Sequence, residues 1–168
     1  MVRARAILAV GFLAASVAAA ADENVVHRDG QPDAFHMSVQ DPRFNEAQAL
    51  ARQSVAEFIA AFQRAGPQQR SFAIKVAVID GSQIEYFWVD LESFANGQFT
   101  GYIGNEPVDV HSVRRGDRVV IDMERITDWM YVDRGHLVGG FTLRALRTGM
   151  SEAARKAFDA TLPFEIIE

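Results

Sequence analysis

Cysteine is absent from this sequence of 168 residues. A chain without cysteine forms no disulfide, offers no thiol nucleophile and carries no lipid on a cysteine thioether. The folded protein must therefore be held together by its hydrophobic core alone.

Positive charge is scarce, because 17 Lys and Arg face 22 Asp and Glu and leave a net charge of −5. Nucleic acids and anionic membranes attract proteins that present a positive field. We therefore predict no nucleic-acid partner. No cofactor-binding motif is present either, and none is predicted.

The sequence begins with an apolar stretch that is too short for a membrane span. Residues 6–17 are apolar, whereas about 20 residues are needed to cross a bilayer. Arg3 and Arg5 precede this stretch, and small residues up to Ala21 follow it before Asp22. This order is typical of an export signal. We predict a signal peptide over residues 1–21, and a periplasmic or secreted mature chain with a net charge of −7 and no transmembrane segment.

The mature chain divides into an arm and a single domain. Residues 22–43 are polar and are interrupted by Gly30, Pro32 and Pro42, so we predict an extended N-terminal arm. The remainder, residues 44–168, suits one domain with a sizeable core.

Hydrophobic periodicity predicts a helix followed by strands. Apolar residues on one helical stripe, with Asn45 and Gln48 as a capping box, predict a helix from about 45 to 65 that packs Phe58 and Phe62 against a sheet. Alternating residues and turn signals then predict strands over 71–79, 84–91, 99–103, 118–123 and 129–132. Residues 137–146 fit either a strand or a helix that starts after Gly139 and Gly140.

Ser151 and Glu152 open a short C-terminal helix that ends near Ala160. These patterns together predict an α+β fold, in which an N-terminal helix packs on an antiparallel sheet of about five strands and a short helix ends the chain.

Several short motifs, taken in order, carry a family resemblance. They are Phe72-Ala-Ile-Lys75-Val, Glu85-x-x-Trp88, Gly101-Tyr-Ile-Gly-Asn105-Glu-Pro107, Gly116-Asp117, Ile126-Thr-Asp128-Trp129 and Gly139-Gly140-Phe-Thr-x-Arg144. With these motifs the chain resembles the YegJ-like family, a bacterial domain of unknown function. The resemblance implies an exported bacterial protein and supplies no catalytic residue.

Acidic residues at strand spacing form two pairs, Asp90 with Glu92 and Asp122 with Glu124. Such pairs could share a proton or hold a cation, or they could simply be solvated. A hydrolase using Asp122, Glu124 or Asp128 is our alternative hypothesis. The four histidines, at positions 27, 36, 111 and 136, have no close ligand spacing. We predict no metal site.

Gly139 and Gly140, followed by Thr142 and Arg144, could form an anion-binding corner if a helix begins there. Close packing of the chain against a neighbour would explain the same glycines.

Four aromatic rings are the candidate binding residues. Tyr86 and Trp88 share one face of their predicted strand, and Trp129 and Tyr131 share one face of theirs. Together they could form a patch that binds an envelope protein or polymer, or a second core covered by Phe158 and Phe164. The leading hypothesis is a non-catalytic binding module of the cell envelope.

Overall fold

The computed structural model describes the backbone of residues 5–9, 25–28, 31–38 and 41–167, and the side chains of residues 41–167. The predicted cleavage site near Ala21 lies outside these residues. No helix in the described part is long and apolar enough to cross a bilayer.

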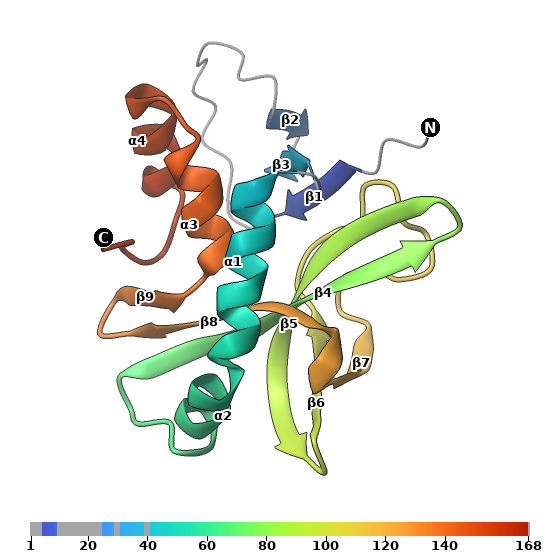
Figure 1. Ribbon diagram of the computed structural model, residues 1–168, viewed down its shortest axis with the longest axis vertical. Coiled ribbons are helices and arrows are strands. Elements are labelled where there is room, and N and C mark those ends of the chain that lie inside the picture. Colours follow the sequence, from blue (N-terminus) through green and yellow to red (C-terminus); the bar gives the residue numbers. More distant parts are fainter. Residues whose placement is uncertain (1–4, 10–24, 29–30, 39–40, 168) are drawn as a thin grey trace.

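The described elements form two runs of strands, and each run is followed by a pair of helices (Figure 1). In chain order they are β1 (Arg5–Ala9), β2 (Val25–Arg28), β3 (Gln31–Ser38), α1 (Pro42–Gln53), α2 (Val55–Gln63), β4 (Gln69–Asp80), β5 (Gln83–Ala95), β6 (Gln98–Ile103), β7 (Arg118–Asp122), the 3-10 turn η1 (Met123–Arg125), β8 (Ile126–Asp133), β9 (His136–Gly139), α3 (Phe141–Thr148) and α4 (Glu152–Ala160).

The sheet confirms the predicted α+β class and has more strands than expected. Six strands pair antiparallel in the order β7-β6-β5-β4-β8-β9, rather than about five. The strands β1 to β3 join this sheet through one parallel pair, Leu8 with Tyr86.

The predicted N-terminal helix exists as two shorter helices. Asp41, rather than Asn45, is the N-cap, because its carboxylate accepts the backbone N–H of Arg43 at 2.9 Å. The helix breaks at Ser54, whose hydroxyl donates back to the Leu50 carbonyl at 2.8 Å. Such back-bonding competes with regular helix geometry.

Residues 137–146, which fit either a strand or a helix by their period, contain parts of both. Residues 136–139 form β9, and α3 begins directly after Gly140. Gly139 and Gly140 both have positive φ, and a Cβ on Gly139 would collide with the carbonyl oxygen and the indole ring of Trp129. Close packing against Trp129 therefore explains this glycine. The C-terminal helix has the predicted cap, Ser151, which accepts the N–H of Ala154.

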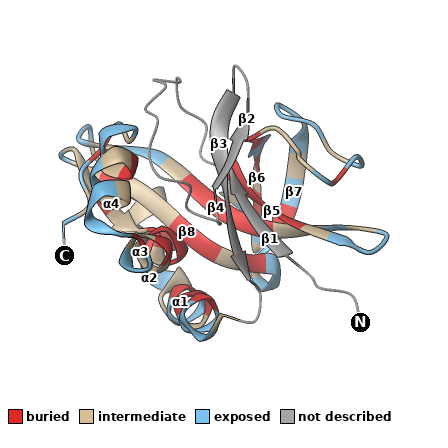
Figure 2. Ribbon diagram, turned by 90° about the horizontal axis from the view of Figure 1, so that it is seen from above, coloured by how far each residue is buried: buried red, intermediate tan, exposed pale blue. Residues whose placement is uncertain are grey.

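The sheet carries a hydrophobic core on each face. One core gathers Tyr86 and Trp88 under residues from α1, α3 and α4, and the other gathers Ile74, Phe87 and Trp129 around α2. Figure 2 shows buried residues concentrated in the middle of β4, β5 and β8. The predicted burial is confirmed for Phe58, which is fully buried and stacks on Trp129 at 5.1 Å between ring centroids, whereas Phe62 is only half-buried against the same core.

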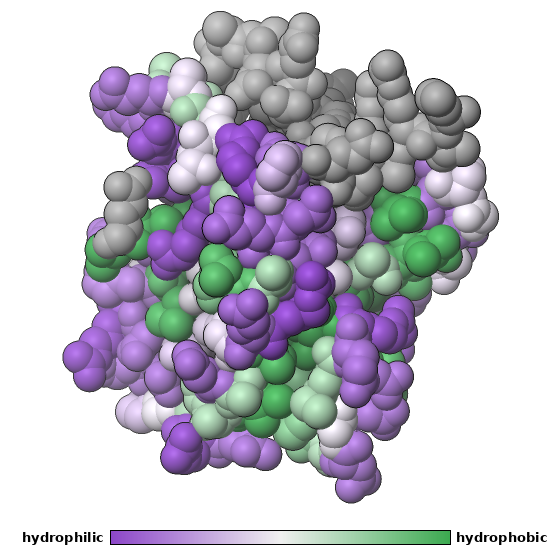
Figure 3. Space-filling view, viewed as in Figure 1, coloured by the Kyte–Doolittle hydropathy of each residue, from purple (hydrophilic) through white to green (hydrophobic). Residues whose placement is uncertain are grey.

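Hydrophobic residues also reach the surface in limited areas. Figure 3 shows hydrophobic surface over the outer end of the β4–β5 hairpin and between α2 and β6. Val55, Met123 and Ile126 line a small groove of about 220 Å³ together with Arg52 and Glu124.

Candidate functional site

A buried polar row crosses three adjacent strands in the centre of the sheet. The pairing register places Lys75 of β4 directly beside Trp88 of β5 and beside Asp128 of β8. All three side chains point to the face that α3 covers, where Thr142 joins them. Lys75, Asp128 and Thr142 are fully buried. Four of the short motifs that carry the family resemblance thus each contribute one residue to the same place.

Thr142 links the lysine to the carboxylate. The Lys75 ammonium donates to Thr142 Oγ1, and this hydroxyl donates to Asp128 Oδ2 at 2.5 Å. The Lys75 Nζ also lies 4.3 Å from the centroid of the Trp88 ring, within range of a cation–π interaction.

The Asp128 carboxylate occupies the N-terminus of α3. It accepts the backbone N–H of Thr142 at 2.8 Å, that of Phe141 at 3.1 Å and that of Trp129 at 2.8 Å. Free N–H groups and the helix dipole favour an anion at this position. Of the two explanations considered for Gly139 and Gly140, the anion corner is therefore also present, and the protein's own carboxylate fills it.

Arg144 does not take part in this corner. Its guanidinium donates instead to the carbonyl oxygens of Leu137, Gly139 and Ile167 at 2.6 to 2.9 Å. Arg144 thus ties the C-terminal residues to β9.

Burial perturbs both ionisable groups of the row. Loss of water lowers the pKa of Lys75 to about 7, although the nearby Asp128 carboxylate opposes this shift. Loss of water also raises the pKa of Asp128, against the effects of Lys75 and of the hydrogen bonds from Thr142 and Trp129. An amine with a pKa near 7 has the chemistry of a base or nucleophile. Because the whole row is sealed from solvent, its evident role in this conformation is to fix α3 on the sheet.

A second set of buried polar bonds holds the loop between β6 and β7. The fully buried Glu85 carboxylate accepts the successive backbone N–H groups of Val108, Asp109 and Val110 at 3.0 to 3.2 Å. Asn105 Oδ1 accepts the N–H of Trp88 at 3.0 Å. The Glu85-x-x-Trp88 and Asn105 motifs therefore anchor this loop.

The four predicted binding rings do not form one patch. Because Asp128 is the residue beside Lys75, its neighbour Trp129 points to the opposite face from Trp88. Tyr86 and Trp88 are buried in the core that contains Phe158 and Phe164, whereas Trp129 is buried and Tyr131 half-buried in the other core. The structure thus brings the rings together in pairs, with the sheet between the pairs.

The predicted acidic pairs also have separate surroundings. Glu92 forms an ion pair with Arg118 at 3.0 Å, and burial raises the pKa of Asp90. Asp122 accepts a hydrogen bond from Gln98, and Glu124 lies in the small groove beside α2. Within residues 41–167 no three His, Cys, Asp or Glu side chains gather as metal ligands.

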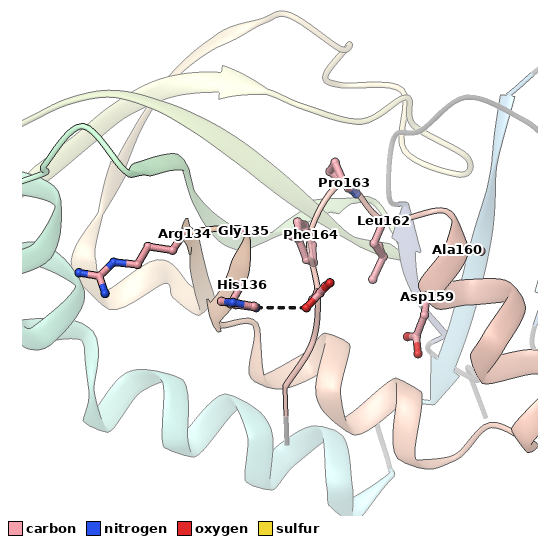
Figure 4. Close-up of a pocket in the computed structure, with 9 residues that line it drawn as sticks. Arg134, Gly135, His136, Asp159, Ala160, Leu162, Pro163 and Phe164 are labelled. Carbon is pink, nitrogen blue, oxygen red and sulfur yellow. Dashed lines mark ion pairs between the residues drawn. The ribbon is translucent and has the colours of Figure 1, made fainter.

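A shallow groove of about 430 Å³ lies at the β9 end of the sheet. Figure 4 shows it between the β8–β9 turn, with Arg134 and His136, and the segment after α4, with Leu162 and Pro163. His136 Nδ1 lies 3.4 Å from the Glu165 carboxylate, as the dashed line marks. The groove offers charges of both signs beside apolar surface. Sequence reasoning missed it because its two sides come from distant segments.

Comparison with known proteins gives relatives and no structural match. The chain is 37% identical over 81 residues to a putative ankyrin repeat protein of Neisseria meningitidis. These residues make up 48% of this chain and 32% of that protein. It is also 37% identical over 76 residues to the uncharacterized protein YegJ of Escherichia coli. These residues make up 45% of this chain and 50% of YegJ. The chain thus matches half or less of the length of these relatives, and no solved structure matches it.

The family model of an "uncharacterized protein conserved in bacteria", DUF2314, matches residues 41–166. This range contains both buried networks and the groove. It also contains all the motifs on which the resemblance to YegJ rests. The chain belongs to the bacterial family DUF2314.

Proposed function

We propose that this chain is a non-catalytic binding module of the bacterial cell envelope, and that it binds a protein or an envelope polymer in the groove at the β9 end of the sheet. The observation that carries this proposal is the composition of the groove. Arg134 and Glu165 present side chains that are 77% and 80% exposed, next to the apolar residues Leu162 and Pro163. Accessible charges around an apolar centre suit a partner surface.

The name of one relative is consistent with a binding role. Ankyrin repeats stack into extended surfaces that bind other proteins. A domain similar to this one in a putative ankyrin repeat protein therefore supports an interaction function.

The envelope part of the proposal depends on the order of basic, apolar and small residues before Asp22. We expect the chain recovered from the extracytoplasmic fraction to begin near Asp22. N-terminal sequencing checks this, and an intact Met1 in the membrane fraction would contradict it.

The alternative, a hydrolase using Asp122, Glu124 or Asp128, needs carboxylates that face a common cavity. Asp128 is sealed beneath α3, and the other two lie on the surface with different neighbours. A binding function is therefore the better supported of the two.

Charge reversal in the groove should weaken binding. We expect Arg134→Glu to reduce retention on insoluble cell-wall material, or on a partner captured from envelope extract, by about fivefold, equivalent to about 1 kcal/mol. The matched control is Arg125→Glu, because Arg125 is exposed on η1, away from the groove. Equal losses for both variants would show that only net charge matters, and the groove would then not be the binding surface.

A further inference from the structure

β7 is an edge strand with an exposed outer face. Among the described residues only β6 pairs with it. Arg118, Val120 and Asp122 are exposed, whereas Ile121 is buried and Val119 half-buried. Figure 2 shows β7 beside β6 at one side of the molecule, with its two ends coloured as exposed.

The outer edge of β7 presents backbone groups that have no partner among the described residues. The Asp117 carbonyl accepts the N–H of Ile103, so residue 117 faces β6. In an antiparallel strand the N–H and C=O of alternate residues point to the same side. Val119 and Ile121 therefore bond to β6, and Arg118, Val120 and Asp122 direct their N–H and C=O groups outward.

The sequence of this strand is complementary to itself. We propose that β7 binds β7 of a second copy of this chain, antiparallel, around a two-fold axis at Val120. In this register Arg118 lies opposite Asp122 of the other copy, and Val120 lies opposite Val120. An interface of this kind is isologous, since the same surface of both copies meets.

Charge complementarity fixes both the partner and the register. Two Arg118–Asp122 pairs form across the axis, and directly opposed opposite charges stabilise a strand pair. Both side chains are already held on this face, Arg118 by Glu92 at 3.0 Å and Asp122 by Gln98 at 2.8 Å. A parallel pairing in register would instead place like charges opposite each other.

Apolar surface at the same place also favours pairing. Val120 is 51% exposed and Tyr102, on the neighbouring strand, is 39% exposed. Val120 meets its own counterpart at the axis and loses this contact with water.

The strand at the opposite end of the antiparallel sheet, β9, has its outer edge covered. There the C-terminal segment covers β9, because Leu137 donates its N–H to Glu165 and Glu165 donates its N–H to Gly135. Exposed strand edges are templates for pairing with another chain. The protein thus covers the β9 edge with its own C-terminal segment, whereas no described segment other than β6 pairs with β7.

Sedimentation of the purified chain between about 1 μM and about 1 mM tests this proposal. We expect a reversible monomer–dimer equilibrium. Val120→Pro removes an outward N–H and leaves the bonds to β6 intact, so it should abolish the dimer while circular dichroism stays unchanged. Arg118→Asp puts like charges across the axis and should raise the dissociation constant at least about tenfold.

The exchange of both charges provides the decisive control. Arg118→Asp combined with Asp122→Arg should restore the dimer, whereas Glu92→Gln, which removes only the pair within one chain, should leave it unchanged. A monomer over the whole range, or a dimer that Arg118→Asp does not weaken, would overturn the proposal. If Val120→Pro does not fold, the charge variants alone decide.

Discussion

Truncation of Trp88 to alanine should lower the free energy of unfolding by about 3 to 5 kcal/mol. The ring is 6% exposed and packs in the core with Tyr86, Leu143 and Phe158. It also forms one wall around the Lys75 ammonium. Its removal leaves a cavity and takes away the cation–π contact, so both packing and electrostatic stabilisation are lost.

Chemical denaturation of the variants measures this effect. Tyr102→Ala is the control, because Tyr102 is an exposed aromatic residue of the same sheet and should change stability by less than about 1 kcal/mol. Trp88→Phe retains a ring, and its loss of stability should lie between those of Trp88→Ala and Tyr102→Ala. An unchanged denaturation midpoint for Trp88→Ala would contradict the burial of this ring and would return it to the candidate binding residues.

The second large effect is an increase in stability at alkaline pH. The ordinary pKa of a lysine is 10.5, and burial lowers the pKa of Lys75 to about 7. Between these values the unfolded chain holds a proton that the folded chain has lost. The free energy of unfolding therefore rises with pH in this window, with a slope of at most about 1.4 kcal/mol per pH unit. The raised pKa of Asp128 acts with the opposite sign, since stability falls with pH wherever the folded carboxyl holds a proton that the unfolded one has lost.

Unfolding by urea from pH 7 to about 9.5 checks this expectation below the ordinary pKa of tyrosine. Lys75→Met should lose the alkaline increase. Lys156→Met is the matched control, because Lys156 is exposed on α4 and its removal should leave the slope unchanged. The same slope in Lys75→Met and in the original chain would exclude Lys75 as its source.

The strands could be predicted because their patterns are local. Alternation along residues 71–79 and 84–91, with the turn at Gly81 between them, locates β4 and β5, although β5 continues to Ala95. The break at Ser54 could not be predicted in this way, because the apolar stripe continues through it. A single hydroxyl bonded to Leu50 marks that break.

The candidate site could be predicted only in part. The glycine pair left two explanations open, close packing and an anion at the start of a helix. Both features are present, but the anion is the Asp128 carboxylate from the neighbouring strand β8. The alternation of a strand places Lys75 on the face opposite Ile74, and it lies there. Its burial depends on α3 crossing that face, and the alternation of a strand does not reveal which faces are covered.

The pairing register of the strands decides whether the four aromatic rings lie on one face of the sheet. Each pair of rings was placed correctly on one face of its own strand. Whether the two pairs meet depends on which residue of β8 lies beside Lys75, and a shift of one residue would have brought them together.

Lys75 and Lys156 are the only lysines in the sequence, and they differ completely in exposure. A reagent that acylates amines reaches Lys156 on the surface of the folded chain. It reaches Lys75 only in molecules whose α3 has separated from the sheet, since the amine lies beneath that helix. The ratio of the two acylated lysines in a partly modified sample is therefore a direct record of how often this chain opens.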